Sequence, residues 1–200
     1  MSRIGIMGGT FDPIHYGHLV LSEQVRSEFD LDKIIFVPAG IPPHKNKESV
    51  TENMHRYFMT VLATIHNPNF TVSDIEVKSE EVSYTIYTIE TLKRMNEYEE
   101  MYFIVGADAI LEIETWKDYD KLLGSCHFVA GTRPGNESQA LVEKIEMLRN
   151  SFNAKIHLLK VPALDISSTD IRNSVAAGKS IKYLVPDAVE QYIYKNGLYK

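Results

Sequence analysis

Six short apolar runs, separated by longer stretches of helical periodicity, limit the folds open to this chain more than any other feature. The runs lie at residues 4–7, 34–37, 70–72, 101–105, 127–130 and 156–159. Strands that are apolar along nearly their whole length are buried on both faces, which is typical of a parallel sheet covered by helices. The pattern therefore predicts a doubly wound α/β sheet, and a ligand of such a sheet binds beyond the carboxyl ends of the strands.

The stretches between the runs carry apolar residues at helical spacing. One stripe consists of Met54, Phe58, Val61, Leu62 and Ile65, a second of Ile86, Ile89 and Leu92, and a third of Leu141, Ile145 and Leu148. Residues three and four apart lie on one face of a helix, so we expect each stripe to face the core.

The end of the chain, after residue 165, has a different pattern. Ser167 is suited to cap a helix with Asp170 at its third position, and Gly178 is suited to end that helix. Pro186 and Gly197 bracket a second helix. Since a domain has about 150 residues, we predict one domain over 1–200. Residues 1–165 would form the sheet and its flanking helices, and residues 166–200 a small helical appendix.

Composition excludes several classes of partner. The 21 Lys and Arg residues against 27 Asp and Glu residues give a net charge of −6, which does not favour a bulk electrostatic grip on nucleic acid. The single Cys126 excludes an internal disulfide and a Cys-rich zinc site. The apolar runs fall well short of the roughly 18 residues that span a bilayer. We therefore expect a cytoplasmic protein that binds neither nucleic acid nor membrane; its oligomeric state stays open, with a homodimer as one option.

The segment GGTFDPIHYGH follows the first run directly. Gly8 and Gly9 allow a phosphate to approach the backbone closely. His15 and His18 are three residues apart and share one face at the start of a helix, where free N–H groups attract anions. This combination suits a triphosphate. Two alternatives are a purely structural histidine pair and a metal site of His15, His18, His44 and Asp12, although nothing in the pattern fixes a tetrahedral geometry.

Two further segments follow predicted strands and carry groups suited to phosphate. PAGIPPHK, residues 38–45, places His44 and Lys45 after a stiff proline pair. DISSTDIR, residues 165–172, offers hydroxyls at a helix start, followed by the guanidinium fork of Arg172. Taken alone, these segments also fit an ordinary solvated loop and an ordinary capped helix.

Together, GGTFDPIHYGH and ISSTDIR resemble the signatures of the nucleotidyltransferase superfamily with the (H/T)xGH motif. The resemblance implies a Rossmann-like fold and the transfer of a nucleoside monophosphate from a triphosphate. It implies catalytic roles for His15, His18, Lys45 and Arg172, and Mg²⁺ bound mainly through the phosphates of ATP.

Three middle segments bear on the acceptor. Ser83-Tyr84-Thr85 starts a predicted helix, Gly106-Ala107-Asp108 follows a predicted strand, and Trp116 is the only tryptophan. An indole can stack on a cationic heteroaromatic ring, and a carboxylate can accept ribose hydroxyls. The alternative is that these residues are helix caps and a core tryptophan.

This set, with TRPG at 132–135, is similar to the nicotinate-nucleotide adenylyltransferases of bacterial NAD biosynthesis. The resemblance implies that ATP and nicotinate mononucleotide give nicotinate adenine dinucleotide and pyrophosphate. The ATP-binding residues that it implies are Gly8, Gly9, Thr10, Phe11, His15, His18, Gly106, Asp108, Arg133, Ser167, Ser168, Thr169 and Arg172. The substrate-binding residues that it implies are Lys45, Tyr84, Thr85, Trp116 and Lys117.

Rival functions remain at this stage. One is another transferase of the superfamily, with a phosphopantetheine or cytidylyl acceptor, and another is a nucleotide sensor without catalysis. A dehydrogenase is disfavoured because GIMGGTF lacks G-x-G-x-x-G. Gly178-Lys179-Ser180 is not a P-loop, because Asn173 stands where the first glycine is needed.

Overall fold

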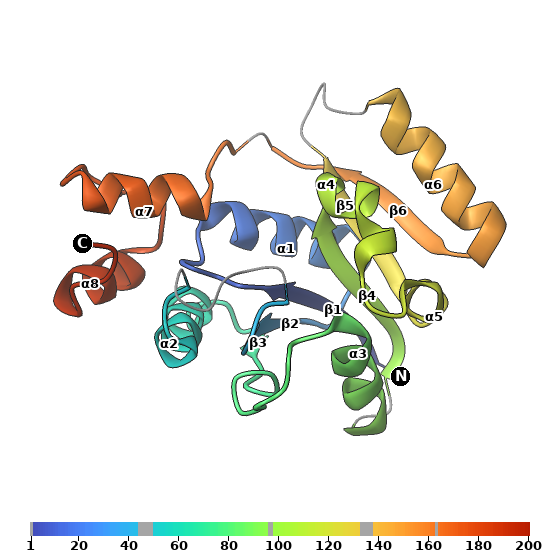
Figure 1. Cartoon of the computed structure of the whole chain (residues 1–200), viewed down its shortest axis with the longest axis horizontal. Helices are drawn as coiled ribbons and strands as arrows, with labels where there is room; N and C mark the ends of the chain where they lie inside the picture. The colour runs from blue at the N-terminus through green and yellow to red at the C-terminus, as the bar shows by residue number, and fades with distance from the viewer. Residues whose placement is uncertain (1, 44–49, 96–97, 133–137, 163) are drawn as a thin grey trace.

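A six-stranded parallel sheet forms the centre of the protein, as a computed structural model shows (Figure 1). The structure describes residues 2–43, 50–95, 98–132, 138–162 and 164–200. The strands are β1 (Ser2–Gly9), β2 (Lys33–Pro38), β3 (Phe70–Val72), β4 (Tyr98–Gly106), β5 (His127–Thr132) and β6 (Lys155–Lys160). They are ordered β3-β2-β1-β4-β5-β6, and every neighbouring pair is parallel. Each of the six predicted runs is a strand, and the predicted doubly wound sheet is confirmed.

Helices cover both faces of this sheet. They are α1 (Tyr16–Glu28), α2 (Asn53–Thr64), α3 (Thr85–Met95), α4 (Ala107–Leu111), η2 (Ile113–Thr115), α5 (Tyr119–Leu123), α6 (Gln139–Phe152), α7 (Ser168–Ala176) and α8 (Asp187–Lys195). One apolar cluster joins α3, α5 and α6 to the sheet, and a second joins α1, α2, α7 and α8 to it. None of the helices in the described part of the chain has the length and apolar character that crossing a membrane requires.

Most of the predicted local features are confirmed. The stripes on α3 and α6 are buried. At the start of α7, the Asp170 backbone N–H donates to Ser167 Oγ at 3.1 Å. Gly178 and Gly197 follow α7 and α8 with φ angles of +67° and +62°, in the left-handed region that glycine adopts readily.

The predicted core stripe on α2 is confirmed at Leu62, which packs against the second apolar cluster, but is wrong at three other positions. Met54, Phe58 and Ile65 are 42%, 44% and 65% exposed, while Arg56, Met59, Thr60 and Thr64 are buried. A polar face can turn inward here because its donors find partners. Each threonine hydroxyl donates to the carbonyl four residues earlier, and Arg56 donates to three backbone carbonyls.

The strand order creates a switch point between β1 and β4. The chain runs from β1 outward to β2 and β3, and then crosses to β4 and runs outward the other way. A crevice opens at the carboxyl end of such a switch point, and this crevice is the general ligand site of open α/β sheets. The helices α7 and α8 lie at one end of the molecule, and α8 packs against α2 (Figure 1).

Candidate active site

The turn after β1 carries the two predicted histidines to the start of α1. His15 is the residue before the first turn of the helix, and His18 is the third helical residue. Their rings stack with centroids 3.8 Å apart, and the His15 backbone N–H donates to His18 Nδ1 at 3.3 Å. Phe11 lies edge-on to the His18 ring at 5.1 Å. Because Nδ1 of His18 accepts this bond, the proton of the neutral ring lies on Nε2.

Burial keeps both histidines uncharged. It lowers the pKa of His15 to about 4. It also lowers the pKa of His18 well below its ordinary value, and the neighbouring His15 lowers it further. A pair of buried imidazoles resists charging because each ring loses water and a second positive charge would repel the first. The pair therefore offers hydrogen-bond donors rather than cations.

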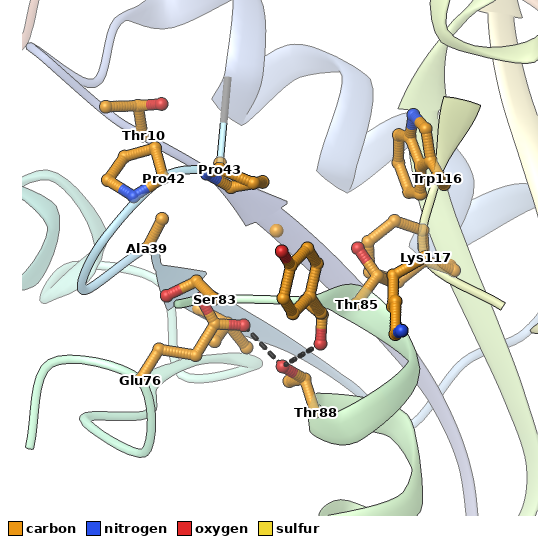
Figure 2. Close-up of a pocket in the computed structure, with 15 residues that line it drawn as sticks. Thr10, Ala39, Pro42, Pro43, Glu76, Ser83, Thr85, Thr88, Trp116 and Lys117 are labelled. Atoms are coloured by element: carbon orange, nitrogen blue, oxygen red, sulfur yellow. Dashed lines mark hydrogen bonds between the residues drawn. The ribbon is translucent and has the colours of Figure 1, made fainter. Parts of the chain in front are cut away.

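A first cavity of about 270 Å³ lies beyond the carboxyl ends of β1 and β2. Figure 2 shows Trp116 and Lys117 on one side of it, and Glu76, Ser83 and Ala39 on the other. The Thr88 hydroxyl donates to Glu76 Oε1. Burial raises the pKa of Glu76, although hydrogen bonds with the hydroxyls of Thr88 and Ser83 partly lower it again. Among the lining residues that the structure describes, Lys117 is the one cation and Glu76 the one carboxylate.

A second cavity of about 380 Å³ lies on the α1 side of the switch point. His15, His18 and Gly106 line it, together with apolar residues of α1 and of the segment after β6. Gly8, Phe103 and Trp116 line both cavities, so the two share a wall at the end of β1. A Cβ at position 8 would lie 3.0 Å from the Phe103 ring, and glycine therefore keeps this wall thin. Two ligands can meet here.

The start of α7 is attached to the turn after β1. Ser168 Oγ donates to the Pro13 carbonyl at 2.9 Å, and Arg172 Nη1 donates to the Asp12 carbonyl at 2.8 Å. Arg172 also donates to Thr169 Oγ1 at 3.3 Å. Segments about 160 residues apart in the sequence thus place the arginine beside the turn that ends in His15.

The structure places most of the predicted site residues in the two cavities or at the start of α7. Gly8, Gly9, Thr10, Tyr84, Thr85, Trp116 and Lys117 line the first cavity. Gly8, His15, His18, Gly106 and Trp116 line the second. Ser167, Ser168, Thr169 and Arg172 lie at the start of α7. Phe11 is buried beneath His18, and Asp108 is exposed in the first turn of α4, outside the lining of both cavities.

Lys45 and Arg133 lie outside the described residues, as do His44 and residues 133–135 of the TRPG segment. Glu76 and Arg56, in contrast, are close to the first cavity, but neither belongs to a motif that the sequence predicted. Pro162, Leu164 and Ile166 line the second cavity. Their place just after β6 could have indicated this, because ligands collect at the carboxyl ends of parallel strands.

Comparison with known proteins assigns the chain to a class and then to a family. A family model described as cytidylyltransferase-like matches residues 6–174, so the class is that of the nucleotidyltransferases. A probable nicotinate-nucleotide adenylyltransferase of Thermoanaerobacter sp. (strain X514) is 59% identical over 99% of this chain and 94% of that relative. Another from Moorella thermoacetica is 56% identical over 99% of this chain and 92% of its own length. The chain belongs to the nicotinate-nucleotide adenylyltransferase family.

A solved structure of the same kind supports the fold. The nicotinic acid mononucleotide adenylyltransferase of Plasmodium falciparum, complexed with NaAD, matches with a TM-score of 0.80 and 26% identity. The match covers 100% of this chain and 98% of that one. The same Plasmodium enzyme complexed with APC matches with a TM-score of 0.78 and 25% identity. Both the sheet and the C-terminal helical part lie within these matches.

Proposed function

We propose that this chain transfers the adenylyl group of ATP to nicotinate mononucleotide, giving nicotinate adenine dinucleotide and pyrophosphate. One observation carries the proposal: two cavities meet at Gly8, Phe103 and Trp116, and the histidine pair lines one of them. The mononucleotide occupies the first cavity, and ATP occupies the second. The junction at Gly8 lets the phosphate of one ligand reach the α-phosphorus of the other.

The first cavity suits a nicotinate ring. Trp116 provides a flat face for a pyridinium, whose positive charge the indole attracts. Thr85 and the backbone after Trp116 hold the carboxylate, with the Lys117 ammonium on the same side of the cavity. Tyr84 also lines this cavity.

The second cavity suits the nucleoside triphosphate. Adenosine lies against Gly106. Asp108, two residues further along the chain, keeps the role toward the ribose hydroxyls that the family resemblance implies. The phosphates extend past His15 and His18 toward Ser167, Ser168, Thr169 and Arg172, where the start of α7 offers N–H groups, hydroxyls and a guanidinium. Lys45 and Arg133 keep the roles that the family resemblance implies.

The chemistry is a direct in-line displacement. A phosphate oxygen of the mononucleotide attacks the α-phosphorus, the bond to the bridging oxygen breaks, and pyrophosphate leaves with the electron pair. The step requires no protein nucleophile, so catalysis consists of positioning and charge stabilisation. His18 Nε2–H donates to an α-phosphate oxygen as negative charge develops there.

Mg²⁺ bound to the triphosphate completes the proposal. In the described part of the chain, no group of three or more His, Cys, Asp or Glu residues is arranged to hold a metal ion. A cation that keeps its waters and binds through phosphate oxygens fits this donor set. When bound, Mg²⁺ neutralises phosphate charge, while the protein residues hold the phosphates in place.

A pyrophosphate-release assay with a panel of acceptors tests the function. The panel contains nicotinate mononucleotide, its amide, and phosphopantetheine, each with ATP, and a cytidylyl acceptor with CTP. We expect the highest kcat/KM with nicotinate mononucleotide and ATP. Preference for phosphopantetheine or for the CTP pair would replace the proposal by another transferase reaction. ATP binding without turnover of any acceptor would indicate a nucleotide sensor.

A further inference from the structure

Arg56 is the most unusual charged residue of the described structure. It lies on α2 and is 1% exposed. A guanidinium cannot discard its charge, so a buried arginine needs a partner for every donor. Burial lowers its pKa, and the nearby Asp12, Tyr199 and Glu76 act against that effect. The cost of burial suggests that the side chain does more than fill space.

The three nitrogens of this guanidinium donate to three different backbone segments. Nη1 donates to the Thr10 carbonyl at 2.7 Å, Nη2 to the Gly40 carbonyl at 3.0 Å, and Nε to the Thr51 carbonyl at 2.8 Å. Thr10 follows β1 and Gly40 follows β2. One side chain therefore joins the two turns that leave the central strands.

Both turns form walls of the first cavity. Thr10 lines it, and so does Ala39, the neighbour of Gly40. Gly40 fits closely, because a Cβ at this position would lie 2.0 Å from the Glu76 carbonyl. The Gly40 backbone N–H also donates to Ser83 Oγ at 2.9 Å, which continues the connection to the start of α3.

We infer that Arg56 is a positioning residue for the mononucleotide site. It holds the turn after β1 and the turn after β2 at the spacing that the acceptor needs. Its guanidinium donates to carbonyl oxygens and does not line the cavity, so it does not touch substrate. A lysine would retain the charge but could not present three donors in one plane, so the planar fork is the essential feature.

Hydrogen–deuterium exchange of the ligand-free protein tests this connection without reference to the reaction. Arg56→Lys keeps the charge, and Arg56→Met keeps much of the volume. We expect both variants to exchange about tenfold faster than wild type in residues 8–12 and in residues 39–42. Unchanged exchange in either segment would overturn the inference, and so would restoration of wild-type exchange by lysine.

A matched control lies one turn further along the same buried face. Thr60 is buried, and its hydroxyl donates only within α2. Thr60→Val disturbs the interior of the helix but not the two turns. We expect its exchange in both segments to match wild type. A general loosening of α2 would instead raise exchange in this variant too, and that result would overturn a specific role for Arg56.

Ligand binding tests whether Arg56 supports the mononucleotide site. This experiment is the one that rests on the proposed function. Trp116 is the only tryptophan, and it lines both cavities, so its fluorescence can follow either ligand in separate titrations. We expect Arg56→Lys to raise the dissociation constant for nicotinate mononucleotide about tenfold and that for an ATP analogue less than threefold, because a displaced wall mainly affects the ligand that contacts it. Equal effects on both ligands would contradict a role specific to the mononucleotide.

The outcomes separate the two proposals. If wild type failed to bind nicotinate mononucleotide, the proposed function would fail, while the exchange experiment would still decide the role of Arg56. If neither Arg56 variant folded, NMR of the wild-type protein would test the role of Arg56. We expect the Arg56 Nε–H to exchange with water far more slowly than that of the exposed Arg94. Equal exchange rates for the two arginines would overturn the inference.

Discussion

His15 and His18 stack ring on ring at the start of α1, and the backbone N–H of the first donates to Nδ1 of the second. The protonation state of each histidine therefore depends on the other. The bond requires Nδ1 of His18 to be unprotonated, and the stacking places any charge on one ring against its neighbour. The histidine pair is therefore neutral, and a polyanion would supply the negative charge that allows the pair to take up a proton.

We predict that ATP-analogue binding takes up protons at pH 7. Phosphate charge raises the pKa of His15 from about 4, so the complex holds more protons than the free protein. Calorimetry in two buffers of different ionisation enthalpy measures the uptake. His15→Gln should reduce it, whereas His55→Gln, on α2 and outside both cavities, should not. Binding heats that are equal in both buffers would contradict the prediction.

We predict that the folded state loses stability in mild acid. The pKa of His15 is about 4 in the folded state and about 6.5 when unfolded, so the unfolded chain binds more protons in between. The free energy of unfolding therefore falls as pH drops from about 6.5 to 4, by roughly 3 kcal/mol for this residue. Urea titrations at several pH values measure the slope. His15→Gln should make it shallower; a slope equal to that of wild type would remove His15 as its cause.

We predict that His18→Ala lowers kcat by roughly 10²–10⁴, the usual range for a group that stabilises charge in the transition state. His18→Asn separates two roles of this side chain. The asparagine amide oxygen can still accept the His15 N–H, but asparagine has no donor at the position of His18 Nε2. We expect the asparagine variant to keep the melting temperature of wild type but to lose kcat like the alanine variant. Normal turnover by a folded His18→Asn protein would refute the donor role.

The sheet could be predicted from the sequence because each strand is coded locally. A run such as residues 101–105 is apolar along its length, and nothing distant is needed to recognise it. The stripe on α2 was misread for the opposite reason. Whether Phe58 or Arg56 faces inward depends on carbonyl groups of Thr10, Gly40 and Thr51, which only the folded chain brings together.

The site was predictable where its chemistry lies in one short segment. His15 and His18 are three residues apart, and the helix start alone brings them together. Glu76 was missed because its role depends on hydroxyls of α3 and on burial in the folded cavity. The meeting of Arg172 with Asp12 required the family resemblance, since spacing alone says nothing about two segments so far apart.

We predict that Lys117 favours the acid mononucleotide over its amide. Lys117 lines the first cavity, and its ammonium has no hydrogen-bond or ion-pair partner among the residues that the structure describes. A nicotinate carboxylate would supply one. Lys117→Gln should raise KM for nicotinate mononucleotide about tenfold, or about 1.4 kcal/mol, and leave the amide nearly unaffected. Steady-state kinetics with both acceptors measure the ratio of the KM for the amide to the KM for the acid. Glu76→Gln removes the opposing charge and should shift the ratio the other way; parallel losses with both acceptors would contradict a charge effect.

We predict that Tyr199, next to the last residue, stabilises the turn before the histidine pair. Its hydroxyl donates to Asp12 Oδ1 at 2.7 Å, and the Thr51 backbone N–H donates to Asp12 Oδ2 at 3.2 Å. Asp12 is 2% exposed, so loss of the Tyr199 hydroxyl leaves Oδ1 of a buried carboxylate without this donor, while Oδ2 keeps the Thr51 N–H. Tyr199→Phe should lower the free energy of unfolding by about 1.5–3 kcal/mol, the usual range for a hydrogen bond to a charged group.

Tyr194→Phe is the matched control for Tyr199→Phe. Tyr194 is 42% exposed on α8, and its hydroxyl bonds to none of the residues that the structure describes. Chemical denaturation should give a wild-type value for this variant. If the two variants are equally stable, the hydroxyl of Tyr199 contributes nothing through Asp12. If Tyr199→Phe also lowers kcat at saturating ATP, the C-terminus helps to position the turn and not only to stabilise it, because Asp12 precedes His15 by three residues.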